Sequence, residues 1–255
     1  MPSPLVCQVR RRLPVALVSL YGTLDETSVV DAVVSLRDCL ADLPTTLVVD
    51  ASHLAVTGIE ALAPLTVLAT DAQRWPGASV SLCSVSATTR SLVNRAAPGG
   101  ELGTCDDAQA TTEEALRRPV PPRMDASLPP GPDMPAASRD LVTQACEEWG
   151  LRRVRRLAEL IMSELASNAV LHARTPAAVT VRLFGSCLQM AVRDGDPRLV
   201  HHPPPGTHGA HDGENGRGLL ILEAMADQWG SVPTGNGKVV WAQVRIPGPR
   251  PVPPL

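Results

Sequence analysis

Glu164-Leu-Ala-Ser-Asn168, Asp194-Gly195-Asp196 and Gly216-Arg217-Gly218 are the stretches that decide how the second half of this sequence folds. An acid and an amide stand four residues apart, an acid follows an apolar run, and glycines precede a helical pattern. Residues four apart share one face of a helix, and a glycine-rich helix start exposes backbone N–H groups that attract phosphate. The order and spacing of the three stretches therefore predict a nucleotide site.

The composition is that of a globular protein with a substantial core. The 255 residues are 44% hydrophobic and 19% charged, with a net charge of −3. This balance does not indicate a nucleic-acid partner, and no apolar run approaches the ~20 residues of a membrane span. The six cysteines include no Cys-x-x-Cys pair, so we expect reduced thiols in a cytoplasmic protein rather than a zinc site or a disulfide scaffold.

A proline-rich segment divides the chain. Residues 118–135 contain seven prolines, a density that predicts an extended linker between a first domain, 1–117, and a second, 122–247. A short strand near 124–128 belongs either to this linker or already to the second domain. The tail, 248–255, is again rich in proline and is expected to be loose.

Strands and helices alternate in the first domain. This alternation predicts an α/β sandwich with a largely parallel or mixed sheet. The expected strands are 6–11, 15–21, 46–50 and 79–83, and the expected helices are 27–40, 59–72 and 87–95.

The second domain has a different order, which predicts an α+β sandwich with helices on one face of an antiparallel-rich sheet. Apolar residues recur every four positions along one of its helices. The segment 196–215 lacks any periodicity, and a loop of that length in a compact domain is usually functional. The expected helices are 135–149, 153–173 and 218–226, and the expected strands are 178–184, 188–193, 228–233 and 239–246, the last two joined by a turn at 235–237.

Two groups of residues have the chemistry of a nucleotide site. The Asn168 amide oxygen is a hard ligand suited to Mg²⁺, and the Glu164 carboxylate can orient water or a hydroxyl. Asp194, at a strand end, can accept a hydrogen bond from an exocyclic amine such as that of adenine, while Gly195 lets a flat ring approach. The alternatives are a solvated helix edge for the first pair and an ordinary Asp-Gly turn for the second.

The expected loop also contains histidines. His201, His202, His208 and His211 lie near Asp212 and Glu214. Their spacing is irregular, so we do not expect a specific metal site there.

In combination, these motifs resemble the Bergerat-type (GHKL) ATP-binding fold. Ser163-Glu-Leu-Ala-Ser-Asn-Ala-Val-Leu-His-Ala173, residues 216–220 and Asp227-Gln-Trp-Gly230 look like the small bacterial anti-sigma-factor serine kinases, over about 123–247. The resemblance implies that Mg²⁺-ATP is bound, with Asn168 on Mg²⁺, Glu164 as the base toward a substrate serine, and Asp194 reading adenine. It further implies that the phosphate side is shaped by Gly195, Gly216, Arg217 and Gly218, with Leu219 completing the glycine motif.

The sequence departs from that family's pattern in two places. Asp194-Gly-Asp-Pro197 lacks the second glycine of the first glycine box, a loss usual in this kinase branch. Relatives often carry a threonine near the adenine on the late strand, where this sequence has Val239. A valine there would remove a hydroxyl and weaken nucleotide binding.

The first domain resembles the STAS domain of anti-sigma-factor antagonists. The resemblance rests on Gly22-Thr-Leu-Asp25 and on Leu47-Val-Val-Asp50-Ala-Ser-His-Leu54. STAS domains of this kind carry a phosphorylated serine at the next helix start. In this sequence the ungapped register places Glu60 at that position, and a register shifted by three residues places Thr57 before Gly58.

Together the resemblances imply a cytoplasmic partner-switching regulator. In this interpretation a serine/threonine protein kinase phosphorylates a separate STAS antagonist, with a sigma factor as a second partner and homodimerisation through the kinase half. The alternative is a non-catalytic ATP-binding module that sequesters a sigma factor and is regulated by its fused STAS-like half.

Overall fold

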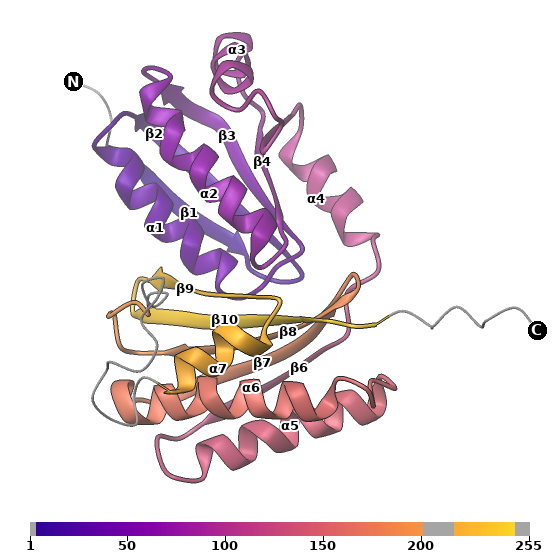
Figure 1. The fold of residues 1–255 in the computed structure, drawn as a ribbon. Helices are drawn as coiled ribbons and strands as arrows, with labels where there is room; N and C mark the ends of the chain where they lie inside the picture. The colour runs from indigo at the N-terminus through magenta and orange to yellow at the C-terminus, as the bar shows by residue number, and fades with distance from the viewer. Residues whose placement is uncertain (1–3, 201–216, 248–255) are drawn as a thin grey trace, which may run out of the picture. The chain divides into compact units, whose positions relative to one another are not determined.

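The computed structural model describes residues 4–200 and 217–247 of the chain (Figure 1). The chain divides into two compact units, Met1–Val120 and Pro121–Leu255. None of the described helices is long and apolar enough to cross a lipid bilayer.

The first unit is built on a five-stranded mixed sheet in the order β1-β2-β3-β4-β5, as its alternating pattern predicted. β1 is antiparallel to β2, and the other neighbours are parallel. The elements are β1 (Val6–Arg11), β2 (Val15–Leu24), α1 (Ser28–Leu40), β3 (Thr46–Val56), the 3₁₀ turn η1 (Glu60–Leu62), α2 (Ala63–Arg74), β4 (Ser79–Cys83), α3 (Ala87–Ala96), β5 (Leu102–Cys105) and α4 (Ala108–Leu116).

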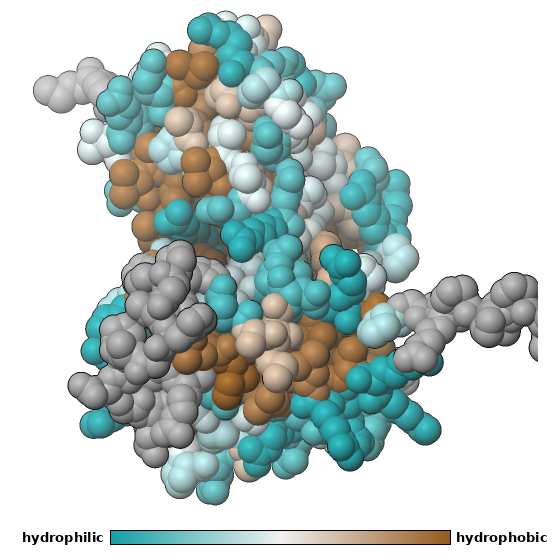
Figure 2. Space-filling view, in the orientation of Figure 1, coloured by the Kyte–Doolittle hydropathy of each residue, from teal (hydrophilic) through white to brown (hydrophobic). Residues whose placement is uncertain are grey.

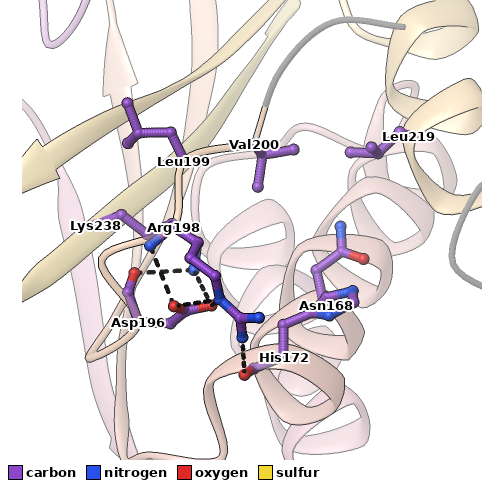
Figure 3. A pocket seen from close by; sticks show the side chains of 8 residues that line it. All are labelled: Asn168, His172, Asp196, Arg198, Leu199, Val200, Leu219 and Lys238. Atoms are coloured by element: carbon purple, nitrogen blue, oxygen red, sulfur yellow. Dashed lines mark hydrogen bonds and ion pairs between the residues drawn. The ribbon is translucent and has the colours of Figure 1, made fainter.

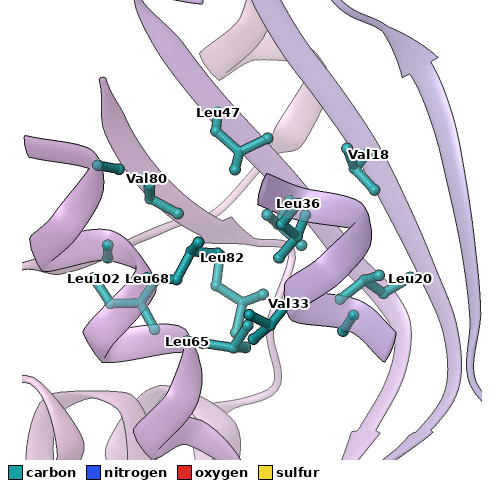
Figure 4. Close-up of a cluster of buried hydrophobic side chains, with 14 of the residues drawn as sticks. Val18, Leu20, Val33, Leu36, Leu47, Leu65, Leu68, Val80, Leu82 and Leu102 are labelled. Carbon is teal, nitrogen blue, oxygen red and sulfur yellow. The ribbon is translucent and has the colours of Figure 1, made fainter. Parts of the chain in front are cut away.

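Successive strand residues in this sheet face opposite layers, which is why two helical layers cover it. Leu47 and Val49 of β3 pack with α1 and α2, where Leu36 and Leu65 are buried (Figure 4). Val48, between them, faces the other side and packs with α4. The alternation of buried residues along β3 therefore fixes helices on both faces of the sheet.

Two cysteines of this unit correct a sequence-based expectation. Cys83 and Cys105 are register partners on the neighbouring strands β4 and β5, and they form a disulfide. The expectation of six reduced thiols was wrong for this pair because strand pairing, which the cysteine spacing does not reveal, brings them together.

Burial raises the pKa of the Cys39 and Cys146 thiols to about 11, so these two free cysteines stay protonated at neutral pH.

The second unit is an antiparallel five-stranded sheet in the order β6-β7-β8-β10-β9. Its helices α5, α6 and α7 lie on one face of the sheet, and the predicted α+β class is confirmed (Figure 1). The elements are β6 (Arg123–Leu128), α5 (Met134–Glu148), α6 (Arg155–Asn168), the π-helical turn η2 (Ala169–Ala173), β7 (Ala177–Phe184), β8 (Cys187–Asp194), α7 (Arg217–Met225), β9 (Gln228–Thr234) and β10 (Gly237–Arg245).

The strand β6 lies inside the proline-rich segment that separates the two halves. It is hydrogen-bonded to β7 along its whole length, from Arg123 opposite Arg182 to Leu128 opposite Ala177. Residues 123–128 are therefore part of the second sheet, and only the residues just before them connect the units.

The long helix expected over 153–173 changes its winding before its end. α6 ends at Asn168, and a π-helical turn continues to Ala173, where Arg174 takes a left-handed conformation with φ 55°. A π turn widens the helix by one residue, and such turns are frequent at functional sites. Sequence periodicity did not distinguish it from ordinary α-helix.

The apolar core of the first unit gives a direct stability test. Replacing the fully buried Leu82 by alanine leaves a cavity and should lower the free energy of unfolding by about 2–5 kcal/mol. Val30→Ala, at a side chain that is 60% exposed, is the matched control and should change it by less than about 0.5 kcal/mol. Hydrogen exchange of the β3 amides under urea measures both, and equal losses for the two variants would contradict this core.

Candidate nucleotide site

The second unit contains a cavity between the end of α6, the end of β8 and the start of β10 (Figure 3). Its volume is about 320 Å³, at the lower end of the range for small-molecule sites. Its lining combines a lysine, an arginine, a histidine, an amide and an acid with three apolar side chains: Asn168, His172, Asp196, Arg198, Leu199, Val200, Leu219 and Lys238.

Asn168, the last residue of α6, has an unsatisfied polar atom at this cavity. Its amide nitrogen is buried and has no hydrogen-bond partner among the described residues. An unpaired buried amide costs about 1–3 kcal/mol, so a polar ligand group that bonds to this amide would be favoured at this position. Since the nitrogen and oxygen of an amide are assigned by their partners, either atom can face that ligand.

Glu164 and His172 flank Asn168 along the same helix. Glu164 lies one turn earlier in α6 and is half-buried, and no described residue bonds to its carboxylate. His172 lies in the π-helical turn, lines the cavity, and accepts a hydrogen bond at its carbonyl oxygen from Arg198, at 3.2 Å. The end of α6 and the π-helical turn therefore present Asn168 and His172 to the cavity, with the Glu164 carboxylate one turn earlier.

Asp194, the last residue of β8, is buried in an ion pair. The Lys238 ammonium donates to Asp194 Oδ1 at 3.0 Å, with side-chain exposures of 4% for the lysine and 1% for the aspartate. The backbone N–H of Asp196 donates to the same oxygen at 2.9 Å. The carboxylate predicted to read adenine thus already has two donors from the protein.

Asp196 continues the same polar network toward the cavity mouth. Its carboxylate lies 3.3 Å from the Lys238 ammonium and accepts from the Arg198 guanidinium at 3.0 and 3.2 Å. The pKa of Asp196 is held well below its ordinary value. The largest cause is the hydrogen bond from the Arg198 side chain, followed by the bond from the Arg198 backbone N–H and the interaction with Lys238. Arg198 in turn reaches the His172 carbonyl, so the network spans the cavity from β10 to the π turn.

The hairpin register corrects the residue expected near the base. Lys238 is directly opposite Asp194, and Val239 is opposite Arg193. Neighbouring residues of a strand point to opposite faces, so Lys238 shares the helix-covered face with Asp194 and Val239 lies on the other. The position that faces the site is occupied by Lys238 rather than Val239.

Glycines allow β8 and β10 to meet closely beside this pair. Gly237 has φ +151°, and a Cβ there would overlap the carbonyl oxygen of Asp194. Gly195 lies against Thr175, whose hydroxyl accepts its backbone N–H at 2.9 Å. Gly195 is therefore used in packing against the turn after η2, in addition to any role toward a ligand.

The glycine motif before α7 is described in part. Arg217 and Gly218 begin α7, and Leu219 reaches the cavity wall. Gly216 lies outside the described residues, as do the loop histidines and acids considered for a metal. Within 4–200 and 217–247, no group of three or more His, Cys, Asp or Glu side chains is arranged to hold a metal ion.

The sequence reasoning missed Lys238, although one signal was available. It is the only lysine among the 23 lysine and arginine residues of the chain. Every other basic residue of this group is an arginine, so a single lysine, with its compact ammonium, is unusual in this chain. The Gly235-Asn236-Gly237 turn, which fixes the register of β10, could have shown where this lysine lies.

The two residues considered as altered phosphoacceptors lie in the first unit. Glu60 is exposed and begins η1, while Thr57 is exposed and its hydroxyl donates to the Leu24 carbonyl at 3.2 Å.

Residues 128–244 match the family model of the histidine kinase-like ATPase domain. The second unit is an ATPase domain of the GHKL type. The match includes α6, β8, α7 and β10, which are the elements around the cavity. No curated protein sequence matches the chain.

Two solved structures are similar to the chain at low sequence identity. One is the anti-sigma factor antagonist SpoIIAA in its unphosphorylated form, with 14% identity and a TM-score of 0.36, covering 45% of this chain and 99% of that one. The other is the Bacillus cell fate determinant SpoIIAA in its phosphorylated form, with 14% identity and a TM-score of 0.34, covering 43% of this chain and 98% of that one.

An adenine nucleotide with Mg²⁺ fits one side of this cavity better than the other. The orphan amide of Asn168 and the nearby Glu164 carboxylate have the chemistry for a metal ion and phosphates. On the base side, Asp194 is enclosed by Lys238 and its carboxylate is withdrawn from solvent.

Removing the buried ammonium should destabilise the second unit. Lys238→Met leaves Asp194 and Asp196 without their shared cation, and breaking a buried ion pair from one side costs about 3–5 kcal/mol. In the double variant Asp194→Asn, Lys238→Met, the loss should be smaller because only one of the two charges then remains. Urea unfolding followed by tryptophan fluorescence measures both; equal losses would mean that the pair is not coupled.

The lowered pKa of Asp196 gives a pH-dependent contribution to stability. A carboxylate whose folded-state pKa is depressed stabilises the fold above its unfolded pKa of about 4, and this contribution disappears as the pH falls toward the lowered value. We therefore expect wild type to exceed Asp196→Asn in unfolding free energy near neutral pH and the difference to shrink below pH ~4. A difference that does not vary with pH would contradict this assignment.

Proposed function

We propose that the chain is an ATP-dependent partner-switching regulator of the bacterial anti-sigma-factor type, with serine/threonine kinase activity toward a separate STAS antagonist protein. The observation that carries the proposal is the amide of Asn168, unsatisfied among the described residues, at the cavity of a GHKL-type ATPase domain, one helical turn from the Glu164 carboxylate. We expect the protein to act in the cytoplasm and to form a homodimer through its second unit.

Each residue of the proposed site has a distinct role. Mg²⁺-ATP would supply the transferable phosphate, with Asn168 as a ligand of the metal. Glu164 accepts the proton of the partner's serine hydroxyl, which increases the nucleophilicity of that oxygen. Gly195, Gly216, Arg217, Gly218 and Leu219 shape the phosphate side, where a helix N-terminus favours negative charge.

The first unit is proposed to act as a built-in STAS-like regulator. In the ungapped register, Glu60 at the start of η1 would place a permanent carboxylate at the position of the phosphorylatable serine, and in the register shifted by three residues Thr57 would stand there. Apolar side chains gather at the surface over α1 and α2, where Val30, Val34 and Val67 are exposed (Figure 2). Exposed apolar patches of this kind mark contact surfaces for protein partners.

A second candidate function is favoured by Lys238. Because its ammonium is ion-paired with the buried Asp194 carboxylate, the second unit can be a module that sequesters a sigma factor and transfers no phosphate. In that case the fused STAS-like unit regulates sequestration alone.

Two substitutions in α6 separate these functions. With γ-labelled ATP, Mg²⁺ and STAS proteins from the same genome, we expect wild type to label a partner serine or threonine. Glu164→Gln should reduce the labelling rate at least ~100-fold with nucleotide affinity retained, because only the proton acceptor is lost. Asn168→Ala should abolish both labelling and Mg²⁺-dependent nucleotide binding.

The control is Glu159→Gln, which removes a carboxylate from the same helix at a position hydrogen-bonded to Thr143, away from the cavity. It should label partners at the wild-type rate. Tight nucleotide binding without transfer to any STAS partner would replace the kinase with the sequestration module.

A further inference from the structure

The Lys238 ammonium uses its hydrogen-bonding capacity entirely within the protein. It donates to Asp194 Oδ1 at 3.0 Å and to the Asp196 carbonyl oxygen at 3.1 Å, and its third neighbour is Asp196 Oδ2 at 3.3 Å. An ammonium has three donors, so these three oxygens satisfy it. Lys238 is therefore a fixed part of the cavity wall.

The ammonium holds Oδ1 of Asp194, one of the two carboxylate oxygens that could accept from an adenine amine, and it covers a side chain that is already buried. An exocyclic amine and an ammonium are both nitrogen donors, and the ammonium adds a full charge, which makes its bond to a carboxylate the stronger one. Asp194 Oδ1 also accepts from the Asp196 backbone, and the carboxylate is only 1% exposed. Because the Asp194 side chain is enclosed together with Lys238, a base could reach either carboxylate oxygen only if this buried ion pair moved.

We propose that Lys238 determines base selectivity in this domain: by holding Asp194, it prevents recognition of the exocyclic amine of adenine. The inference rests on the proposed nucleotide-binding function and refines its ligand class. The cavity then takes a purine nucleoside triphosphate through its phosphate side, at Asn168, and is indifferent to the group at position 6 of the purine.

The backbone supports this assignment as a built feature. Gly237 brings the start of β10 against the Asp194 carbonyl, which sets Lys238 directly opposite Asp194. Because they are directly opposite each other on neighbouring strands, the Lys238 and Asp194 side chains meet through the pairing of β8 with β10 alone.

Purine riboside triphosphate, which lacks only the amine at position 6, provides the test. Calorimetry with Mg²⁺ should give wild-type affinities for ATP and this analogue that agree within about threefold. Lys238→Thr frees Asp194 while keeping a hydroxyl donor, and should tighten ATP about tenfold or more without tightening the analogue, as expected for a hydrogen bond to a charged group. In Asp194→Asn, Lys238→Thr, that gain should disappear.

The single lysine allows a second measurement on the unaltered protein, should the variants fold poorly. Acetylation of the ε-amine by an amine-reactive ester, followed by mass spectrometry, reports whether Lys238 leaves its ion pair, with the N-terminal amine as internal control. We expect slow acetylation whose rate is the same with ATP and with the analogue. Acceleration by ATP alone would mean that adenine displaces Lys238 and would overturn the inference.

The remaining outcomes separate this inference from the proposed function. A wild-type preference for ATP of tenfold or more, unchanged in Lys238→Thr, overturns the inference even if a partner is phosphorylated. The expected affinity pattern without phosphotransfer supports the inference and removes the kinase. Failure of every protein to bind either nucleotide overturns both.

Discussion

The antiparallel pairing of β8 with β10 is the constraint on which the candidate site depends. Its register brings Lys238 opposite Asp194 and leaves Val239 on the far face. Gly237 makes the approach possible, because any side chain there would overlap the Asp194 backbone. A one-residue shift would reverse the faces, moving the charges off the helix-covered face and putting a valine in their place. The polar character of the cavity is therefore a property of the sheet more than of any single side chain.

The helical side of the cavity is positioned by the packing and winding of α6. α6 packs an apolar stripe that includes Ile161 and Leu165 on the sheet, and this packing turns Asn168 toward the cavity. The switch from α to π winding directly after Asn168 sets the position of His172, whose carbonyl receives Arg198. Sheet and helix thus meet through one network of charged groups, from Lys238 through Asp196 to Arg198.

Much of this architecture could be predicted from the sequence, for identifiable reasons. Apolar periodicity indicated α1 and α6, and the glycine turn indicated the β9–β10 hairpin. β5 and α4 were missed because both are short: Leu102–Cys105 is four residues long and Ala108–Leu116 is nine. The Cys83–Cys105 disulfide and the Lys238–Asp194 pair were missed because both arise from strand register, which links residues 22 and 44 positions apart. Spacing along the chain predicted the motif at Glu164 and Asn168, since a helix converts sequence distance directly into geometry.

The lone lysine also bears on how this chain can be modified. Acetylation, methylation and ubiquitination of lysine all require an accessible ε-amine. The only such amine in the sequence is Lys238, and it is 4% exposed and held by two aspartates. The folded chain therefore presents no reactive ε-amine at its surface, and a lysine-directed modification can reach it only after the second unit has opened at β10.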